Sequence, residues 1–273
     1  MRAPLFLIPL ALSSAACSDP AEFQRDAGVE APEDRTASAE AEPSAEATAF
    51  EEQTGDGGPG ERSFAYDWPA EVGAEDALVR RLTAERDRLL AEQKRDYADA
   101  LPDAPEDCVA CRTRSLDKQW QVVADLPDWL SLSAEIATYS GGAHGLYTRQ
   151  SLVWDRNAKR ALAGIDLFAS SVDLEQALGA RLCDALDAER ALRRGSPVAR
   201  DSGEMFDDCP GLDEASVFVG SSNGEGFDRI GVYFGPYVAG PYAEGPYELD
   251  FPVTPSVIDA VKPEYANAFK VKR

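Results

Sequence analysis

The chain has 273 residues, with 49 acidic and 27 basic side chains and a formal net charge of −22 at neutral pH. This excess of negative charge argues against nucleic-acid binding, because a phosphate backbone attracts proteins of the opposite charge. It favours cationic partners, although acidic exported domains are common and the charge can serve solubility alone.

The N-terminus has the layout of a bacterial secretory signal. Residues 1–16 start with the positively charged Arg2, continue through an apolar run and end in small side chains, as signal peptides do. The apolar run is about ten residues long, whereas a membrane-spanning helix needs about 20. We therefore expect this segment to be removed rather than to anchor the protein.

A cysteine follows the signal directly. The stretch Leu12-Ser13-Ser14-Ala15-Ala16-Cys17 resembles a bacterial lipobox, with Ser14 where Leu is usual. The resemblance implies cleavage before Cys17 and acylation of its thiol, and Ser18 in place of Asp implies sorting to the outer membrane. The alternative is ordinary cleavage near Ala16, which leaves a free N-terminal thiol.

Residues 17–62 are predicted to be the acylated cysteine and a disordered acidic tether. From Ser18 to Arg62 the chain is rich in Ala, Glu, Pro, Ser and Gly and has almost no large apolar side chains. Such a stretch cannot bury enough surface to offset the entropy lost on ordering. We expect a flexible tether that repulsion between its carboxylates keeps extended.

The rest of the chain suits one globular domain made of two intimately joined subdomains, 63–125 and 126–273. In the first subdomain, alternating side chains predict a strand over 63–68. A helix is predicted over 75–100, because its large apolar residues fall near one face and it contains neither Gly nor Pro.

Four cysteines remain beyond the anchor, and in an oxidising compartment an even number favours two disulfides with three possible connectivities. We favour Cys108–Cys111, within a loop over 101–114, and Cys183–Cys209. The second disulfide closes a longer loop and should stabilise the folded chain by on the order of 3 kcal/mol. A thioredoxin-like site is disfavoured because the first pair lies in a loop, and a zinc site because no second pair matches it.

From residue 120 onward, β-structure dominates. A helix is predicted over 172–192, capped by Ser170 or Ser171, and a short one after Thr254, with Pro255 at its first position. The order of elements predicts an α+β fold, a largely antiparallel sheet with packed helices. The predicted strands are 120–126, 130–139, 146–155, 215–220, 227–234 and 247–251.

His144 is the only histidine, so a Ser-His-Asp or Cys-His catalytic site would have to use it. We favour a structural role in the turn of Gly141, Gly142 and Gly145, in which the glycines permit positive φ and the imidazole bonds backbone groups of the turn. Nucleophile elbows, phosphate-binding glycine loops and His-Glu-x-x-His motifs are absent from the sequence. A paired-carboxylate hydrolase is an alternative, but no pair stands out. We expect no catalytic residue, metal or cofactor.

A second notable stretch runs from Tyr233 to Tyr247, where tyrosines are interleaved with prolines and glycines. Such a loop is stiff and carries amphipathic rings, which offer a large contact area at low entropic cost and are enriched at interfaces. The alternative is that the rings pack beneath the loop as part of the core. The residues predicted to bind a partner are Pro236, Tyr237, Pro241 and Tyr242.

The Gly-Gly-Ala-His turn, Asp166-Leu167-Phe168 and the stretch Pro236 to Gly245 together resemble the uncharacterised domain of PdaC-type deacetylases and RsiV-type anti-sigma factors. The resemblance covers about residues 63–269 and implies an extracytoplasmic α+β domain. In the anti-sigma branch it implies a receptor for lysozyme. In the deacetylase branch the catalytic metal domain is a separate module, whose metal-ligand motifs this chain does not match. The sigma-binding segment and transmembrane helix of the anti-sigma branch are not recognisable either.

We therefore expect a lipid-anchored, non-catalytic binding protein of the bacterial envelope, placed at the outer membrane and facing the periplasm. The expected partner is a lysozyme-like, cationic or other cell-wall-associated protein, and the membrane is contacted only through the lipid. Two alternatives are a cell-wall glycan hydrolase or deacetylase-type enzyme, and a structural envelope tether.

Overall fold

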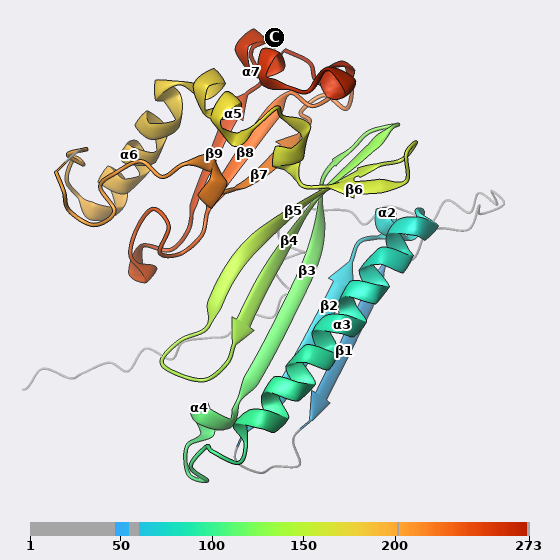
Figure 1. The fold of residues 1–273 in the computed structure, drawn as a ribbon, viewed down its shortest axis with the longest axis vertical. Helices are drawn as coiled ribbons and strands as arrows, with labels where there is room; N and C mark the ends of the chain where they lie inside the picture. The colour runs from blue at the N-terminus through green and yellow to red at the C-terminus, as the bar shows by residue number, and fades with distance from the viewer. Residues whose placement is uncertain (1–46, 55–59, 201, 272–273) are drawn as a thin grey trace, which may run out of the picture. The chain divides into compact units, whose positions relative to one another are not determined.

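The computed structural model describes residues 47–54, 60–200 and 202–271, which belong to one compact unit (Figure 1). The predicted signal peptide, Cys17 and most of the predicted tether lie outside these residues. Two β-sheets and several helices make up the described part, so the fold is α+β, as predicted. No helix of the described part is both long and apolar enough to cross a lipid bilayer.

The larger sheet has six strands that follow one another in chain order, and all neighbouring pairs are antiparallel except β2 and β3. A parallel pair needs a crossover connection, which the long helix α3 supplies here. The strands are β1 (Thr48–Thr54), β2 (Arg62–Trp68), β3 (Arg114–Asp125), β4 (Trp129–Tyr139), β5 (Leu146–Asp155) and β6 (Arg160–Leu162).

The smaller sheet has three antiparallel strands, β7 (Ser216–Gly220), β8 (Arg229–Phe234) and β9 (Tyr247–Pro252). Short 3-10 helices cover Gly164–Leu167, Leu212–Glu214, Tyr242–Glu244 and Pro263–Ala268. The α-helices are α2 (Ala70–Gly73), α3 (Asp76–Ala100), α4 (Val109–Arg112), α5 (Ser171–Leu178), α6 (Ala180–Arg194) and α7 (Pro255–Ala260).

One hydrophobic core lies between α3 and the larger sheet. Every second residue of β2 is buried, as expected for a strand with one covered face. Phe64 and Tyr66 pack with Leu78 and Leu82 of the helix. The hydroxyl of Tyr66 accepts a hydrogen bond of 3.0 Å from Trp120 Nε1, so these two polar groups of the core satisfy each other.

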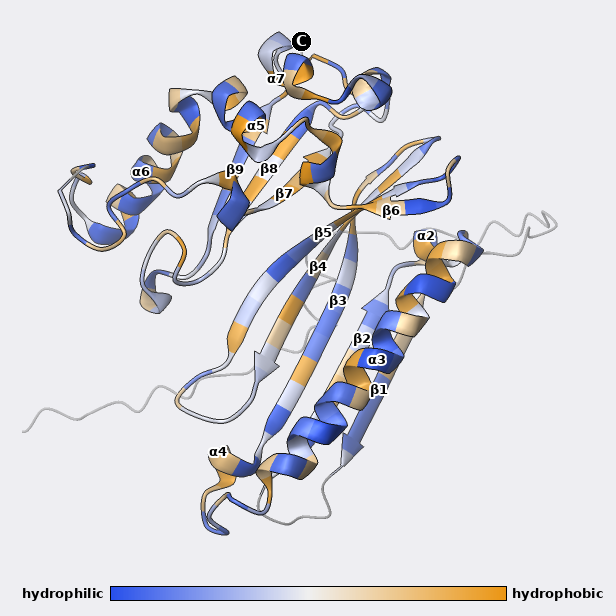
Figure 2. Cartoon of the chain, in the orientation of Figure 1, coloured by the Kyte–Doolittle hydropathy of each residue, from blue (hydrophilic) through white to orange (hydrophobic). Residues whose placement is uncertain are grey.

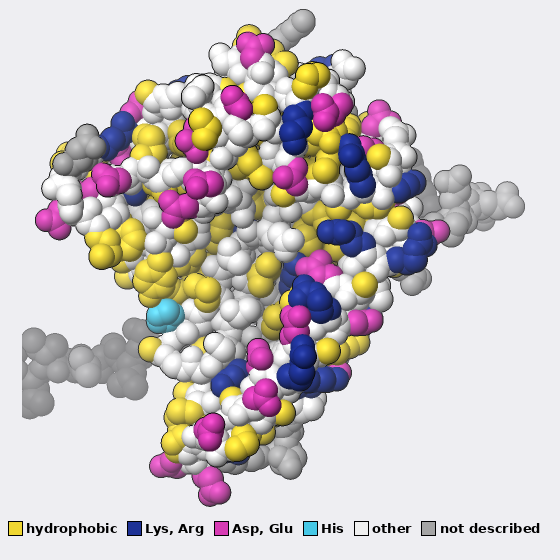
Figure 3. Space-filling model, in the orientation of Figure 1, with side chains coloured by type: hydrophobic (Ala, Val, Ile, Leu, Met, Phe, Trp, Pro, Cys, Tyr) yellow, Lys and Arg dark blue, Asp and Glu magenta, His cyan; other side chains and the backbone are white. Residues whose placement is uncertain are grey.

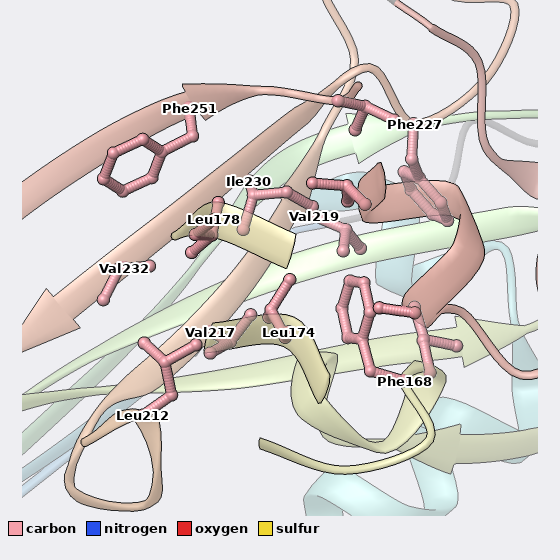
Figure 4. Packing of buried hydrophobic residues seen from close by; sticks show 14 of the residues in the cluster. Phe168, Leu174, Leu178, Leu212, Val217, Val219, Phe227, Ile230, Val232 and Phe251 are labelled. Carbon is pink, nitrogen blue, oxygen red and sulfur yellow. The ribbon is translucent and has the colours of Figure 1, made fainter. Parts of the chain in front are cut away.

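A second core lies between α5 and the smaller sheet (Figure 4). Leu174 and Leu178 of α5 pack with Val217, Val219 and Ile230 of the strands. The hydropathy of the sequence agrees with this core, because β7 is largely hydrophobic (Figure 2). In α3, which covers the first core, many residues are hydrophilic (Figure 2). The larger core cluster is thus built on the later half of the chain.

The strand β1 lies in the stretch that was predicted to be tether. Thr48–Thr54 pairs in antiparallel register with β2, and the ring of Phe50 packs edge-on against Phe64 at 6.1 Å. Its only large apolar residue is Phe50, so its composition resembles that of the acidic segment before it. The domain therefore starts before Ser63, and the flexible-tether prediction is wrong for these seven residues.

Two further boundaries differ from the prediction. The predicted helix over 172–192 is two helices, because Gly179 between them has a φ of +59° and Ser170 caps the first one. The predicted subdomain boundary at residue 125 falls between β3 and β4, which are neighbours in one sheet. The larger sheet therefore spans the predicted boundary, and the two sheets, rather than residues 63–125 and 126–273, are the natural parts of the fold.

Both favoured disulfides are present. Cys108 is bonded to Cys111, with 5.3 Å between their Cα atoms, and Cys183 is bonded to Cys209, with 5.6 Å between theirs. The first holds the turn around α4, and the second ties α6 to the loop that follows it. Two disulfides are typical of a protein in an oxidising, extracytoplasmic compartment.

Candidate functional site

The two segments that stand out in the sequence meet in the structure. The ring of His144 stacks on that of Tyr242 with 3.9 Å between centroids and 23° between planes. Tyr237 lies 5.7 Å from Tyr242, and Tyr147 lies the same distance away on another side. We refer to His144, Tyr147, Tyr237 and Tyr242 as the aromatic surface. In Figure 3 the histidine (cyan) lies on the surface beside hydrophobic side chains.

Hydrogen bonds fix the orientation of the imidazole. The Nδ1 atom of His144 lies 2.9 Å from the carbonyl oxygen of Gly145, which can only accept, so Nδ1 carries the proton. In the neutral ring Nε2 is then an acceptor, and the hydroxyl of Tyr237 donates to it over 3.3 Å. Tyr242 donates to the same Gly145 carbonyl over 2.9 Å. The rings are thus coupled through polar contacts as well as stacking.

The turn that carries His144 needs its glycines. Gly141 and Gly142 have the predicted positive φ, +92° and +102°, whereas Gly145 does not. Tyr139 donates to the Gly142 carbonyl over 2.7 Å. A Cβ atom on Gly141 would lie 3.3 Å from the carbonyl oxygen of Ala110 in α4. The Cys108–Cys111 disulfide therefore stiffens the helix against which this turn packs.

Tyr237 is held in a conformation that a tyrosine rarely adopts. Its φ is +70°, and its N–H donates to the carbonyl of Gly240 over 3.1 Å. A left-handed conformation costs a residue with a Cβ atom about 1 to 2 kcal/mol. The residue is nevertheless 51 % exposed. Strain combined with exposure of a large ring is typical of a residue retained for contact rather than for stability.

The loop that bears Tyr237 is fastened to α6 by a buried arginine. Arg190 has no exposed side-chain surface, and its guanidinium donates to the carbonyl of Ala239 over 2.9 Å. The same group donates to the carbonyls of Asp207 and Asp208, in the segment before Cys209. One side chain therefore joins the tyrosine loop, α6 and the disulfide-bearing loop.

Two more arginines of α6 hold the far end of the loop. Arg193 donates to the carbonyls of Glu244 and Pro246 over 2.8 and 2.6 Å. Arg194 binds the Glu244 carboxylate through both Nε and Nη2, and Tyr247 donates to that carboxylate as well. Burial raises the pKa of Glu244, but these hydrogen bonds outweigh it and hold the pKa below its usual value.

The four residues predicted to bind a partner differ in accessibility. Tyr237 and Pro241 are exposed and Tyr242 is half-buried. Pro236 is buried, so in this structure it shapes the loop and offers no accessible contact. Tyr233 and Tyr247 belong to the core, as the alternative interpretation of the loop expects, whereas Tyr237 is exposed.

Arg190, Arg193 and Arg194 were absent from the predicted site. Their spacing of three and four residues places them on one side of a helix, and this is the only sequence signal that could have drawn attention to them. The partners they reach, backbone carbonyls about 50 residues further along the chain, leave no trace in the sequence.

Among residues 47–54, 60–200 and 202–271, no group of three or more His, Cys, Asp and Glu side chains is placed to hold a metal ion. Within the same ranges, the hydrogen-bond partners of the His144 ring are a tyrosine hydroxyl and a backbone carbonyl. The arrangement can stack, donate hydrogen bonds and exclude water from a flat contact.

Comparison with known proteins gives matches only among solved structures. No family model matches the chain, and no curated protein matches it. A DUF3298 family protein from Pseudomonas aeruginosa is 19 % identical with a TM-score of 0.46, over 84 % of this chain and 96 % of that one. A member of the same family from Bacteroides fragilis is 16 % identical with a TM-score of 0.44, over 76 % and 90 %. The structural neighbours of the chain are thus DUF3298 family proteins.

Proposed function

We propose that this protein is a lipid-anchored binding protein of the bacterial envelope that recognises a protein partner through the aromatic surface and carries out no chemistry itself. The observation that carries the proposal is the stack of His144 on Tyr242, which joins residues 98 positions apart in the sequence into one exposed patch. In this proposal the signal peptide directs export and the lipid on Cys17 attaches the protein to the membrane.

Preorganisation supports a binding role. The loop behind Tyr237 is fastened by Arg190, Arg193 and Arg194, and the turn behind His144 rests on α4. A surface that is already ordered loses little conformational entropy on association, and tyrosine has few rotatable bonds to immobilise. The aromatic surface therefore has the properties of a binding hot spot.

The partner that fits best is a cationic lysozyme-like protein. The chain carries a net charge of −22, which accelerates encounter with a cationic partner at low salt. The resemblance to the RsiV-type domain supports the same partner, because His144, Tyr237 and Tyr242 of the aromatic surface lie in two of the segments that carry it. A PdaC-like or RsiV-like relationship is itself part of this proposal.

Calorimetric titration of the mature protein with several lysozymes at low salt tests the proposal. We expect measurable binding that Tyr237→Ala and Tyr242→Ala each weaken by about tenfold or more. The matched control is Val172→Ala on α5, because Val172 is 54 % exposed and Tyr237 51 %. Absence of heat with every lysozyme, or an equal loss in the control, would refute this partner.

The anchor has its own test. Mass spectrometry of the protein isolated from bacterial membranes should find a mature chain that starts at an acylated Cys17. Cys17→Ser should release the protein from the membrane fraction, since a single serine cannot carry the thioether-linked lipid. Recovery of an intact Met1 start would overturn the envelope part of the proposal.

A further inference from the structure

A second candidate site lies on the larger sheet and shares no residue with the aromatic surface. In Figure 1, α3 runs in front of β1 and β2, and β4 and β5 lie to one side of it. Beside the helix is a cavity of about 780 Å³, lined by α3 together with β3, β4 and β5. Pockets that hold small organic ligands measure about 300 to 1,000 Å³, so the cavity is large enough for one.

A charged side chain is built into the inner wall of this cavity. Lys118 on β3 is only 2 % exposed. Its ammonium group pairs with Glu85 of α3, donates to Gln150 Oε1 over 2.7 Å and lies 4.7 Å from the centroid of the Trp120 ring. These contacts satisfy Lys118 and neutralise Glu85, so the pair forms a polar wall with little net charge.

The remaining charges of the lining are positive. Arg88 forms an ion pair with Glu92 on the neighbouring turn of α3. Arg81 lines the cavity and is exposed, and within the described ranges its side chain has no hydrogen-bond or ion-pair partner. The cavity therefore presents one uncommitted cation on a protein whose overall charge is strongly negative.

The other side of the cavity is apolar. Leu89 of α3, Leu116 of β3 and Ile136 of β4 line it, and all three are only partly buried by the protein itself. Apolar side chains left half-covered in a concave site gain about 25 cal/mol per Å² when a ligand removes their remaining surface from water. The lining thus offers one guanidinium next to a hydrocarbon wall.

We propose that this cavity binds a small organic monocarboxylate with an unbranched apolar body. Arg81 takes the carboxylate in the bidentate geometry that a guanidinium offers, and Leu89, Leu116 and Ile136 cover the hydrocarbon. A single negative charge matches the single free cation. A dianionic headgroup such as a phosphate monoester would leave its second negative charge without a partner, because Arg88 is already paired with Glu92 and Lys118 with Glu85.

Titration calorimetry of the full chain with octanoate tests this site. We expect saturable one-to-one binding, with octan-1-ol at least about tenfold weaker and octyltrimethylammonium weaker still, because only the carboxylate can pair with Arg81. Equal affinity for octanoate and octan-1-ol would refute the role of charge. Tighter binding of octyl phosphate than of octanoate would refute the choice of headgroup.

Paired variants locate the binding. Arg81→Gln should weaken octanoate by about tenfold, whereas Arg95→Gln should not, although it removes the same charge about 21 Å further along α3. Ile136→Trp should block binding by filling the cavity. Identical affinities of the two arginine variants would overturn the proposal. Arg81→Gln should still bind lysozyme, so the two proposals can fail independently.

Discussion

The aromatic surface and the α3 cavity are built in different ways. The aromatic surface consists of side chains from the turn at His144, the start of β5 and the tyrosine loop. Its shape depends on hydrogen bonds from Arg190, Arg193 and Arg194 and on the two disulfides. The cavity is lined by one helix and three strands, whose side chains are spaced by regular secondary structure. The first is therefore sensitive to single polar substitutions at a distance, and the second is not.

Removal of the buried arginine should separate the two surfaces most clearly. Arg190→Ala leaves the carbonyls of Ala239, Asp207 and Asp208 without their donor, so the free energy of unfolding should fall by about 3 to 5 kcal/mol. Urea denaturation measures this loss. While the variant is folded, lysozyme affinity should drop and octanoate affinity should stay constant.

Arg193→Ala is the matched control for that variant. Arg193 also donates to two carbonyls of the loop, but its side chain is 30 % exposed, so water can replace its hydrogen bonds and the loss should be about 1 kcal/mol. If both variants cost the same, burial of the guanidinium is not what fastens the loop.

Each disulfide should stabilise the fold by an amount that increases with the length of chain it closes. Replacing Cys183 and Cys209 by Ala removes a link over 26 residues and should lower the free energy of unfolding by about 3 kcal/mol. Replacing Cys108 and Cys111, which are three residues apart, should lower it by about 2 kcal/mol. Urea denaturation of the two double variants gives both values. Both should weaken lysozyme binding, since each disulfide supports one of the two segments. A loss of octanoate binding would contradict the independence of the cavity.

The anchoring carboxylate should make the aromatic surface sensitive to acid. Glu244→Gln should lower the free energy of unfolding by about 2 kcal/mol at neutral pH, because it weakens charge-assisted bonds from Arg194 and Tyr247. The pKa of Glu244 is lowered in the folded state. The stabilisation by this carboxylate is thus present at a pH above its pKa in the unfolded chain. It disappears as the pH falls through its lower pKa in the folded protein. The difference between wild type and variant should shrink accordingly in urea denaturation at successive pH values. A difference independent of pH would show that the carboxylate is not the anchor.

The sequence was informative about the aromatic surface and silent about the cavity for a physical reason. Glycine, proline and tyrosine have conformational and interfacial preferences that act locally, so the turn at His144 and the loop at Tyr237 could be recognised in isolation. Lys118 could not, because a lysine in a strand is ordinarily solvated. Its burial depends on Glu85 and Gln150, which only the folded sheet brings to it.

The same reasoning explains the errors in the fold. The strand β1 has one large apolar side chain and is stabilised by pairing with β2, which is a nonlocal effect. The predicted helix over 172–192 kept its apolar face through Gly179, whose φ of +59° interrupts the backbone without changing the hydrophobic pattern. The caps at Ser170 and Thr254 were predictable because they act within three residues.

The smallest effect concerns the strain at Tyr237, and it distinguishes a residue kept for binding from one kept for stability. Tyr237→Asn and Tyr237→Ala both remove the exposed ring, so both should weaken lysozyme binding to the same extent. Asn tolerates a φ of +70° better than Ala, so the Asn variant should be the more stable of the two by about 0.5 to 1 kcal/mol. Thermal unfolding compares their stabilities and calorimetry their affinities. If Ala is as stable as Asn, the backbone at this position relaxes and the strain is not intrinsic to the loop. If the Asn variant also keeps full affinity, the ring of Tyr237 is not part of the contact, and His144 and Tyr242 alone would have to carry it.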